Sequence, residues 1–450
     1  MLLKILKNYS RIHRKEIQKK MKKLQPVRGT RDVLEEEFKD FQAHLMIWNA
    51  LTTHYGFNMV GTPILEDSEV FKKTLGVTSD IIKKETYTFK DRSNNEITLR
   101  PEGTAPIIRF FINNKLQKSL PQKFSYVGPM FRYDRPQKGR FRQFNQFGVE
   151  VIGEKDIAAD IELIYFARDF VNKVGISDKF FKIYVNSLGD EVSRKKYTLE
   201  IQNFFQDHKR KLTSESLERL KKNPLRILDT KNNEEKKLLI KAPKLKDFLS
   251  TESSDIFEEF KEGCKQLNVP IVLNDNLVRG LDYYNNICYE FVSNDIGAQD
   301  SFLAGGRYDG LIKKMGGPDY PGCGLAVGVE RLMMLSRTNN KIENFKKFTT
   351  PVSYVAIAVG KENKIKAIEI ISKIREKITS SPKLSSVDFI CRDNLSKGLR
   401  YASEKKAAFA IIIGQEEILN KEVTIKNLQK RTQKKVKSNN IAEIFNQIEE

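Results

Sequence analysis

The chain has 450 residues, a formal net charge of +21 and 40% hydrophobic residues. This length predicts two or three domains with sizeable cores. The charge favours a polyanionic partner such as nucleic acid, although lysine-rich codon usage alone would produce part of it. No apolar run approaches the ~20 residues of a membrane span. The four cysteines lack CxxC spacing and the four histidines form no HExxH motif, so we expect reduced thiols and neither a histidine metal site nor a His-dependent triad.

Residues 1–23 form a basic leader with nine Lys or Arg and one acid, Glu16. Its apolar part is too short for a secretory signal. Three interpretations stay open: a disordered extension, an organelle presequence, or an extended start with Met21 as the true initiator. The expected compartment is the cytoplasm, or an organelle matrix if residues 1–20 are removed.

The first predicted helix follows an extended Pro/Gly segment, 25–31. Asp32 and Glu35 predict a capping arrangement at its start, and Gly56 predicts its end. Its apolar face repeats at helical spacing in Phe38, Phe41, Leu45, Trp48 and Tyr55. A short strand is predicted over 57–65. Pro63 places this strand at a sheet edge or a subunit interface, because proline cannot donate to the ladder.

Strands predicted over 86–91 and 96–100 flank a turn signal at 93–95. A helix then begins near Ala105, with Pro106 suited to its first turn. Glu102 and Thr104 therefore lie at a strand-to-helix junction, where side chains can face a ligand. For Thr104 alone, a helix cap is an equal alternative.

Residues 126–150 predict a hairpin of two strands, 124–132 and 142–152. The loop between them, 133–141, is longer than a usual hairpin turn. Because the loop is cationic, it predicts a surface that binds an anion, with a solvated tip as the alternative. Alternation places Gln146 and Glu150 on one face of the second strand. Together with Arg132, these polar side chains occupy strand positions where packing alone would favour apolar ones.

A helix is predicted over 157–173, followed by a Lys-, Glu- and Leu-rich helical insertion over 188–265. Glycine-containing motifs then resume at 277–284, 304–310 and 322–331. The last has one residue too many for GxGxxG and does not follow a clear βαβ strand. No GxxxxGK[ST] occurs, so any use of ATP does not involve a P-loop.

A polar linker is predicted over 337–350, and the period of the pattern changes after it. Strands are predicted over 352–359, 387–391, 408–413 and 422–428, and helices up to 377, over 396–406 and over 440–449. Asn363 predicts a helix N-cap. This alternation indicates a small α/β domain with a largely parallel sheet, whereas the first domain reads as antiparallel α+β. The basic residues between 421 and 437 predict either a solvated edge or an RNA contact.

Five motifs in this order and spacing resemble class II aminoacyl-tRNA synthetases, and most closely the histidyl-tRNA synthetase family. They are LRPEGT (99–104), GPMFRYDRPQKGRFRQF (128–144), LVRGLDYY (277–284), AGGRYDG (304–310) and GVER (328–331). The resemblance runs from about Leu24 to Glu450. It implies an α+β fold with a six- or seven-stranded antiparallel catalytic sheet in 24–187 and 266–336, the helical insertion 188–265, and a C-terminal α/β anticodon-binding domain, 351–450. It also implies a homodimer through the helix at 37–55 and the strand that carries Pro63.

The resemblance implies activation of L-histidine by ATP, followed by transfer of the histidyl group to the 3′ end of histidine tRNA. Mg²⁺ would accompany ATP on its outer phosphates, and no protein metal site is predicted. Arg132 and Arg279 would act as the catalytic residues at the α-phosphate, where Arg132 also holds the substrate carboxylate, and Arg331 would hold the γ-phosphate. Guanidinium groups suit these tasks because they stay charged and donate bidentately to phosphate.

The histidine site implied by the resemblance has two parts. The ammonium group would be bound by Glu102, Thr104 and Gln146, with Gly103 in the same segment. The imidazole would lie among Glu150, Tyr283, Tyr284 and Tyr308, although ordinary core packing is the alternative for Tyr283 and Tyr284. Arg135, Gln137, Lys138 and Arg140 would approach the tRNA acceptor end. Asn145 departs from the histidine common in the family, which removes a proton-transfer role at this position.

Two rival functions stay open at this point. One is a paralogue without charging activity, such as the regulatory subunit of ATP phosphoribosyltransferase, which lacks an anticodon domain. The other is a pseudo-synthetase that senses uncharged tRNA. Residues 351–450 and the three arginines Arg132, Arg279 and Arg331 argue against the first, and the absence of an attached effector domain argues against the second. The anticodon-contacting residues cannot be assigned from the sequence.

Overall fold

The computed structural model describes residues 24–75, 81–222, 224–230, 232–278, 283–296, 301–337, 351–378 and 385–440. The chain divides into two compact units, which are described separately. The basic leader, Arg279, most of the linker and the last predicted helix lie outside the described residues. Within the described part of the chain, no helix is long and apolar enough to cross a membrane.

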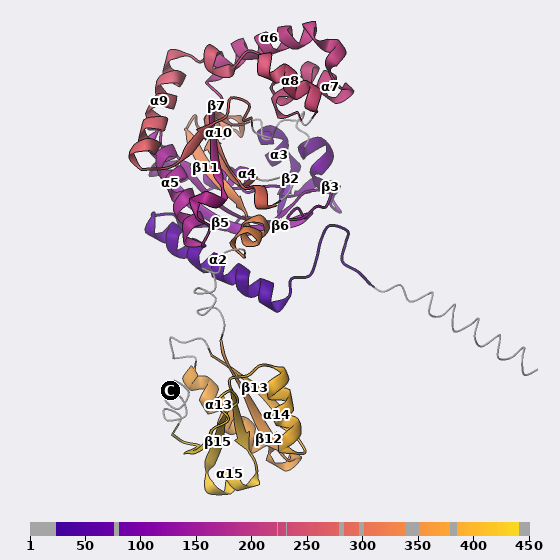
Figure 1. Cartoon of the computed structure of the whole chain (residues 1–450), viewed down its shortest axis with the longest axis vertical. Helices are drawn as coiled ribbons and strands as arrows, with labels where there is room; N and C mark the ends of the chain where they lie inside the picture. Colours follow the sequence, from indigo (N-terminus) through magenta and orange to yellow (C-terminus); the bar gives the residue numbers. More distant parts are fainter. Residues whose placement is uncertain are drawn as a thin grey trace, which may run out of the picture. The chain divides into compact units, whose positions relative to one another are not determined.

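The larger unit is built on an eight-stranded sheet with the order β1-β5-β6-β11-β10-β9-β7-β8 (Figure 1). The strands are β1 Asn58–Met59, β5 Gln122–Phe131, β6 Gln143–Ile152, β11 Gly322–Gly328, β10 Ser301–Arg307, β9 Asn285–Val292, β7 Lys182–Ser187 and β8 Ile271–Leu273. The six central strands pair antiparallel, whereas β1 and β8 pair parallel at the two edges. The predicted antiparallel sheet and the hairpin β5–β6 are therefore confirmed.

Aromatic side chains attach two long helices, α2 Glu35–His54 and α5 Ala158–Lys173, to this sheet. Trp48 of α2 is fully buried and stacks on Phe147 of β6, with 5.3 Å between ring centroids. Gly56 follows the end of α2 with φ +76°, which a residue with a side chain adopts less easily.

Two predictions for α2 are wrong. The residue before the helix is Leu34, with no side-chain capping bond, so Asp32 and Glu35 form no cap. Three acids in the first turn favour the helix start electrostatically instead. The predicted apolar face is also incomplete, because Phe38 is 50% exposed.

The segment 57–65 does not form one strand, which corrects the sequence prediction. Asn58–Met59 pairs with β5 in the large sheet, whereas β2 (Leu65–Asp67) pairs with β4 (Glu96–Leu99) in a separate three-stranded sheet. Pro63 lies between the two pieces, where its missing N–H interrupts pairing. The third strand of this small sheet, β3 Tyr87–Lys90, forms the predicted hairpin with β4. Helices α3 Ser68–Leu75 and α4 Thr104–Asn113 follow β2 and β4.

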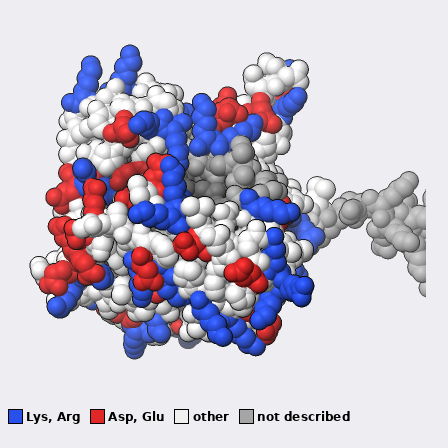
Figure 2. Space-filling view, turned by 90° about the horizontal axis from the view of Figure 1, so that it is seen from above, with Lys and Arg blue, Asp and Glu red and all other residues white. Residues whose placement is uncertain are grey.

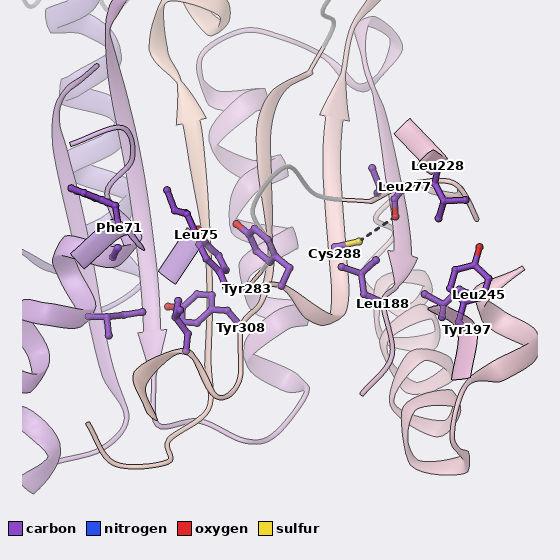
Figure 3. Close-up of a cluster of buried hydrophobic side chains, with 14 of the residues drawn as sticks. Phe71, Leu75, Leu188, Tyr197, Leu228, Leu245, Leu277, Tyr283, Cys288 and Tyr308 are labelled. Atoms are coloured by element: carbon purple, nitrogen blue, oxygen red, sulfur yellow. Dashed lines mark hydrogen bonds between the residues drawn. The ribbon is translucent and has the colours of Figure 1, made fainter. Parts of the chain in front are cut away.

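The predicted insertion is helical, with α6 Glu191–Asp207, α7 Ser214–Lys222, α8 Asn233–Lys241 and α9 Thr251–Gln266. In Figure 1, α6, α7 and α8 lie together at the top of the larger unit. Their core is continuous with that of the large sheet: Leu188 and Tyr197 belong to the same buried cluster as Tyr283 and Tyr308 (Figure 3).

The smaller unit carries a five-stranded sheet with the order β13-β12-β14-β15-β16. Its strands are β12 Val352–Val359, β13 Ser385–Arg392, β14 Phe409–Ile413, β15 Glu422–Asn427 and β16 Gln433–Lys437, and its helices are α13 Lys364–Ile378, α14 Leu395–Glu404 and α15 Gln415–Asn420. The α/β class is confirmed, but the sheet is mixed rather than largely parallel, because β15 and β16 pair antiparallel.

Helix α15 and strand β16 were not predicted from the sequence. Strand β16 reads QKKVK, and only Val436 among its five residues is buried, so its pattern resembles a charged tail. Asn363 directly precedes α13, but its side-chain amide donates to the carbonyl of Val359 (2.7 Å).

Candidate active site

A cavity of about 350 Å³ opens on the face of the large sheet, between β6, β9, β10 and β11 and the first turns of α4 and α11 (Val329–Ser336). Eight of the predicted site residues line it: Glu102, Thr104, Arg132, Arg140, Gln146, Tyr283, Tyr284 and Arg331. Seven of them come from four separate motifs, and Gln146 lies two residues beyond one of these. The antiparallel order of the strands brings the motifs together.

The floor of the cavity is made of small residues. Gly148, Ala326 and Ala304 are direct cross-strand partners, and the row ends at Glu290 of β9. In the neighbouring row, Glu150 lies across Gly324: a Cβ on Gly324 would lie 1.8 Å from the Glu150 Oε2 atom. Small residues in the central strands therefore leave room for larger side chains, and for a ligand, above the sheet.

Glu102 stabilises the start of α4. Its two carboxylate oxygens accept hydrogen bonds from the backbone N–H groups of Thr104 (2.6 Å) and Ala105 (2.9 Å). Burial raises the pKa of the Glu102 carboxyl, and these two bonds oppose the shift. Gly103 is required for space, because a Cβ there would lie 2.1 Å from the Tyr126 ring. Thr104 is not a helix cap: its hydroxyl donates to Glu150 Oε1 (2.7 Å).

Glu150 and Tyr308 lie directly behind Thr104. The Tyr308 hydroxyl donates to Glu150 Oε2 (2.7 Å), and both residues are 1% exposed. Burial raises the pKa of Glu150 to about 8, so its carboxyl holds a proton at neutral pH. The structure thus brings these two residues to the predicted site, where they reach the cavity through Thr104.

Two polar atoms on the cavity wall are buried and have no hydrogen-bond partner within the described residues. They are Gln146 Oε1 and the Tyr283 hydroxyl oxygen. The ring of Tyr283 lies 4.7 Å from that of Tyr284 and 6.0 Å from that of Tyr308. Buried polar atoms are normally paired, so these two indicate where a polar ligand would bind.

Three cationic side chains occupy the opposite part of the cavity. Arg132 donates from Nε to the Pro101 carbonyl (2.9 Å) and lies 5.3 Å from the Phe144 ring centroid. Arg331 donates from Nε to the Gly139 carbonyl (3.2 Å) and from Nη1 to the Ser301 carbonyl (2.5 Å). Arg140 forms an ion pair with Asp134. These bonds of Arg132 and Arg331 go to neutral acceptors, which an anionic ligand can replace.

The remaining loop residues lie outside the cavity. Arg135, Gln137 and Lys138 are exposed, and Gln137 and Arg140 form a single β-bridge that closes the loop. Arg279 falls within 279–282, outside the described residues, so its predicted place cannot be compared.

Acidic residues on the cavity wall were missed by the sequence analysis. Glu330 accepts hydrogen bonds from the Asn145 backbone N–H (2.9 Å) and from the Asn145 side-chain amide (3.0 Å). Burial raises the pKa of Glu330. Asn145 therefore orients a carboxylate beside Arg331. Glu330 and Asp134 stand inside the quoted motifs 328–331 and 128–144, so a signal was present for both, whereas Glu290 had none.

Arg307 of the AGGRYDG motif has a structural task. It forms a buried ion pair with Asp160 of α5 and donates to the carbonyl of Glu154 (3.1 Å). Within the described part of the chain, no group of three or more His, Cys, Asp or Glu side chains could hold a metal ion.

Comparison with known proteins agrees with this geometry. A sequence model described as histidyl-tRNA synthetase matches residues 29–332, more than half of the chain. The chain belongs to the histidyl-tRNA synthetase family. A second model, described as an anticodon binding domain, matches residues 354–448.

Relatives in this family match over nearly their whole length. The histidine–tRNA ligase of Gluconobacter oxydans is 40% identical over 425 residues, which cover 94% of this chain and 99% of that protein. The histidine–tRNA ligase of Wolbachia sp. subsp. Brugia malayi is 41% identical, with 94% and 98% covered. The crystal structure of apo histidyl-tRNA synthetase from S. aureus has a TM-score of 0.75 at 30% identity, and the match covers 94% of this chain and 99% of that one. The class II synthetase fold is thereby confirmed.

Proposed function

We propose that this chain is a histidine–tRNA ligase. It activates L-histidine with ATP to histidyl-adenylate and diphosphate, and then transfers the histidyl group to the 3′ end of histidine tRNA, with release of AMP. The observation that carries the proposal is a single cavity in which two arginines, Arg132 and Arg331, face one part and two unpaired polar atoms, on Gln146 and Tyr283, face another.

The amino acid is proposed to bind at the end of the cavity formed by α4 and β6. An ammonium group needs acceptors, which Gln146 Oε1 and the carboxylate of Glu102 supply. The imidazole is proposed to lie against Tyr283 and Tyr284, with Tyr308 and the protonated Glu150 behind them. A wall of this kind rejects apolar analogues, because its polar atoms would lose their partners.

The ATP phosphates are proposed to bind at the arginine end. Attack of the histidine carboxylate on the α-phosphorus needs positioning and neutralised charge more than proton transfer. Arg132 is bonded to the carbonyl of Pro101, the residue before Glu102. It is proposed to contact both the α-phosphate and the carboxylate, with Arg279 opposite. Arg331 is proposed to bind the γ-phosphate. Mg²⁺ is part of the ATP substrate here. Glu290 and Glu330 are two of the four carboxylates that line the cavity, and Mg²⁺ prefers oxygen ligands of this kind.

Transfer to tRNA is proposed to use the loop 133–141 and the C-terminal unit. Arg135, Gln137 and Lys138 are exposed at the loop tip, with Arg140 at the cavity, as acceptor-end contact requires. The chain carries a net charge of +21, and Figure 2 shows Lys and Arg side chains around the middle of one face. We assign 24–187 and 266–336 to the catalytic core, 188–265 to an insertion, 337–350 to a linker and 351–450 to anticodon binding.

A homodimer is also proposed, on the evidence of an exposed apolar segment. Met59, Ile64 and Leu65 are 49%, 40% and 52% exposed and cluster around Pro63, at and beside the edge strand β1. A second copy would cover them. Light scattering at micromolar concentration should give twice the chain mass of 52.0 kDa. The proposed compartment is the cytoplasm, or an organelle matrix if residues 1–20 are removed, and N-terminal sequencing of the mature protein decides this.

Histidine-dependent ATP–pyrophosphate exchange tests the function. Exchange that needs histidine excludes both a regulatory paralogue and a tRNA sensor without activation chemistry. A protein without such exchange is not a ligase. A truncation after Arg337 is expected to keep some exchange and lose tRNA charging. Full charging by that fragment would refute the domain assignment.

A further inference from the structure

The two helices that bound the insertion cap each other at their N-termini. Asp190 caps α6 by accepting from the Ser193 N–H (2.7 Å), and Ser250 caps α9 by accepting from the Ser253 N–H (3.1 Å). The caps are also joined: the Ser250 hydroxyl donates to Asp190 Oδ2 (2.7 Å), and the Ser250 N–H donates to the Ser193 hydroxyl (2.8 Å). The capping residues of each helix therefore also bond to the other helix, so the two N-termini are held together. We call Asp190, Ser193, Ser250 and Ser253 the insertion joint.

Tyr283 and Tyr284 form a tyrosine wall of the cavity. The segment that follows them in the chain is bonded to the insertion joint and to its neighbours on α6. Arg194, on the first turn of α6, donates from Nη1 to the main-chain carbonyl of Tyr284 (3.1 Å). Two residues further on, Asn286 donates its N–H to the Gly189 carbonyl (3.1 Å) and accepts from the Ser253 hydroxyl (3.1 Å). Asn286 has φ +43°, a left-handed conformation that needs such support.

The other end of the same segment is held from β7. The side-chain amide of Asn186 donates to the Leu277 carbonyl (3.0 Å), and Leu277 is buried beside Cys288. Figure 3 shows Tyr283 in the same cluster as Leu188 and Tyr197, the last of which lies on α6. The insertion and the tyrosine wall thus share one continuous apolar core, and hydrogen bonds also join them.

We propose that Arg194 is a positioning residue for the histidine pocket. It holds the main chain of Tyr284 from the outer side, so that Tyr283 and Tyr284 keep the spacing that fits an imidazole. The insertion is then a structural part of the amino-acid end of the cavity. This inference rests on the proposed function, because it assigns the tyrosine wall to histidine.

The neighbouring Lys195 offers a matched control. It lies on the same helix and lines the same outer groove as Arg194, but it is exposed and forms its ion pair with Glu191 (2.7 Å). Replacing either residue by methionine removes one positive charge from the groove. Only the Arg194 change removes the bond to Tyr284.

The test measures KM for histidine and KM for ATP in pyrophosphate exchange with full-length protein. Arg194→Met is expected to raise KM for histidine about fivefold or more, as the loss of a wall-positioning hydrogen bond implies, and to leave KM for ATP within about twofold. Arg194→Lys, which keeps a donor, should recover part of the loss, and Lys195→Met should match wild type.

Three outcomes would overturn the proposal: an unchanged KM for histidine in Arg194→Met, an equal rise in both KM values, or the same effect from Lys195→Met. If Arg194→Met does not fold, Arg194→Lys carries the test, since its shorter reach should give an intermediate KM for histidine and a wild-type value would contradict the proposal. Wild-type exchange that does not depend on histidine would refute the proposed function, and this inference with it. If exchange depends on histidine but KM for histidine does not change in the Arg194 variants, only the inference is refuted.

Discussion

The two ends of the cavity are built in different ways. At the amino-acid end, Glu102, Thr104 and Glu150 are at most 5% exposed and bonded to one another or to the start of α4. At the phosphate end, Arg132 and Arg331 are bonded to main-chain carbonyls on neighbouring loops and strands. A preformed pocket suits discrimination of a small side chain, whereas cations whose hydrogen bonds go to main-chain carbonyls suit a highly charged substrate that can replace those bonds.

The largest expected effect is at the phosphate end. Arg132→Ala should lower histidine-dependent exchange by about 1,000-fold or more, because a charge that neutralises the reacting phosphate is lost. Its melting temperature should stay close to wild type, since the hydrogen bond that is lost goes to a single main-chain carbonyl, that of Pro101. Arg135→Ala, on the exposed loop, is the control and should keep exchange. Comparable exchange by Arg132→Ala and wild type would remove Arg132 from the site.

At the amino-acid end, the next largest effect is expected on the free energy of unfolding. Gly324→Ala places a Cβ 1.8 Å from Glu150 Oε2, so the carboxyl must move and its bonds to Thr104 and Tyr308 must break. We expect a loss of about 1–3 kcal/mol in the free energy of unfolding together with a higher KM for histidine. Urea unfolding measures the first.

Gly328→Ala is the matched control in the same strand. Its Cβ would lie 3.7 Å from the nearest atom, an ordinary contact. Equal destabilisation by the two substitutions would contradict the role given to Gly324.

Melting temperature measured as a function of pH tests whether Glu150 is protonated, independently of the arginines. The pKa of Glu150 is about 8 in the folded protein, above its usual 4.5, so the folded state holds the extra proton. Its contribution to stability is full below about pH 4.5 and is lost as the pH rises through 8. Glu150→Gln mimics the protonated form, so its melting temperature should fall less than that of wild type between pH 6 and 8.5. Parallel curves would show that Glu150 is ionised.

The smallest effect is expected at Asn145, which bonds to Glu330 beside Arg331. Asn145→Ala removes the side-chain donor to Glu330 but leaves the backbone N–H bond, so Glu330 keeps a partner. We expect at most about a tenfold loss in kcat/KM for ATP, in line with one lost hydrogen bond to a carboxylate. A much larger loss would indicate that Asn145 contacts substrate itself.

The parts of the molecule whose structure depends on local sequence pattern were predicted from the sequence. Aromatic and β-branched residues predicted β5, and alternation predicted β6. A continuous apolar run predicted β12 with its bounds unchanged. Glu102 and Thr104 were found because they lie at a strand-to-helix junction. Gln146 was found because it is a polar residue inside a strand, where packing alone would favour an apolar one. In contrast, the strand predicted over 57–65 is divided at Pro63 between two sheets. This division depends on the strands with which the two pieces pair, β5 and β4.

The features that the sequence did not predict depend on contacts between distant segments. Asn145 and Glu330 are 185 residues apart, so nothing near either residue predicts their bond. Glu150 lies across Gly324 only because β6 and β11 pair in that register. Strand β16 is held by β15 although four of its five side chains are exposed. In each case the pairing of strands or loops, rather than local propensity, decides the outcome.

The most direct test of the function is transfer of the amino acid itself. Full-length protein is incubated with ATP, labelled histidine and a histidine tRNA transcript, and acid-precipitable label is counted. We predict histidyl-tRNA that forms only with histidine and ATP together, at a rate that Arg132→Ala abolishes. Label that fails to enter tRNA, or that enters equally well with an apolar amino acid in place of histidine, would contradict the account.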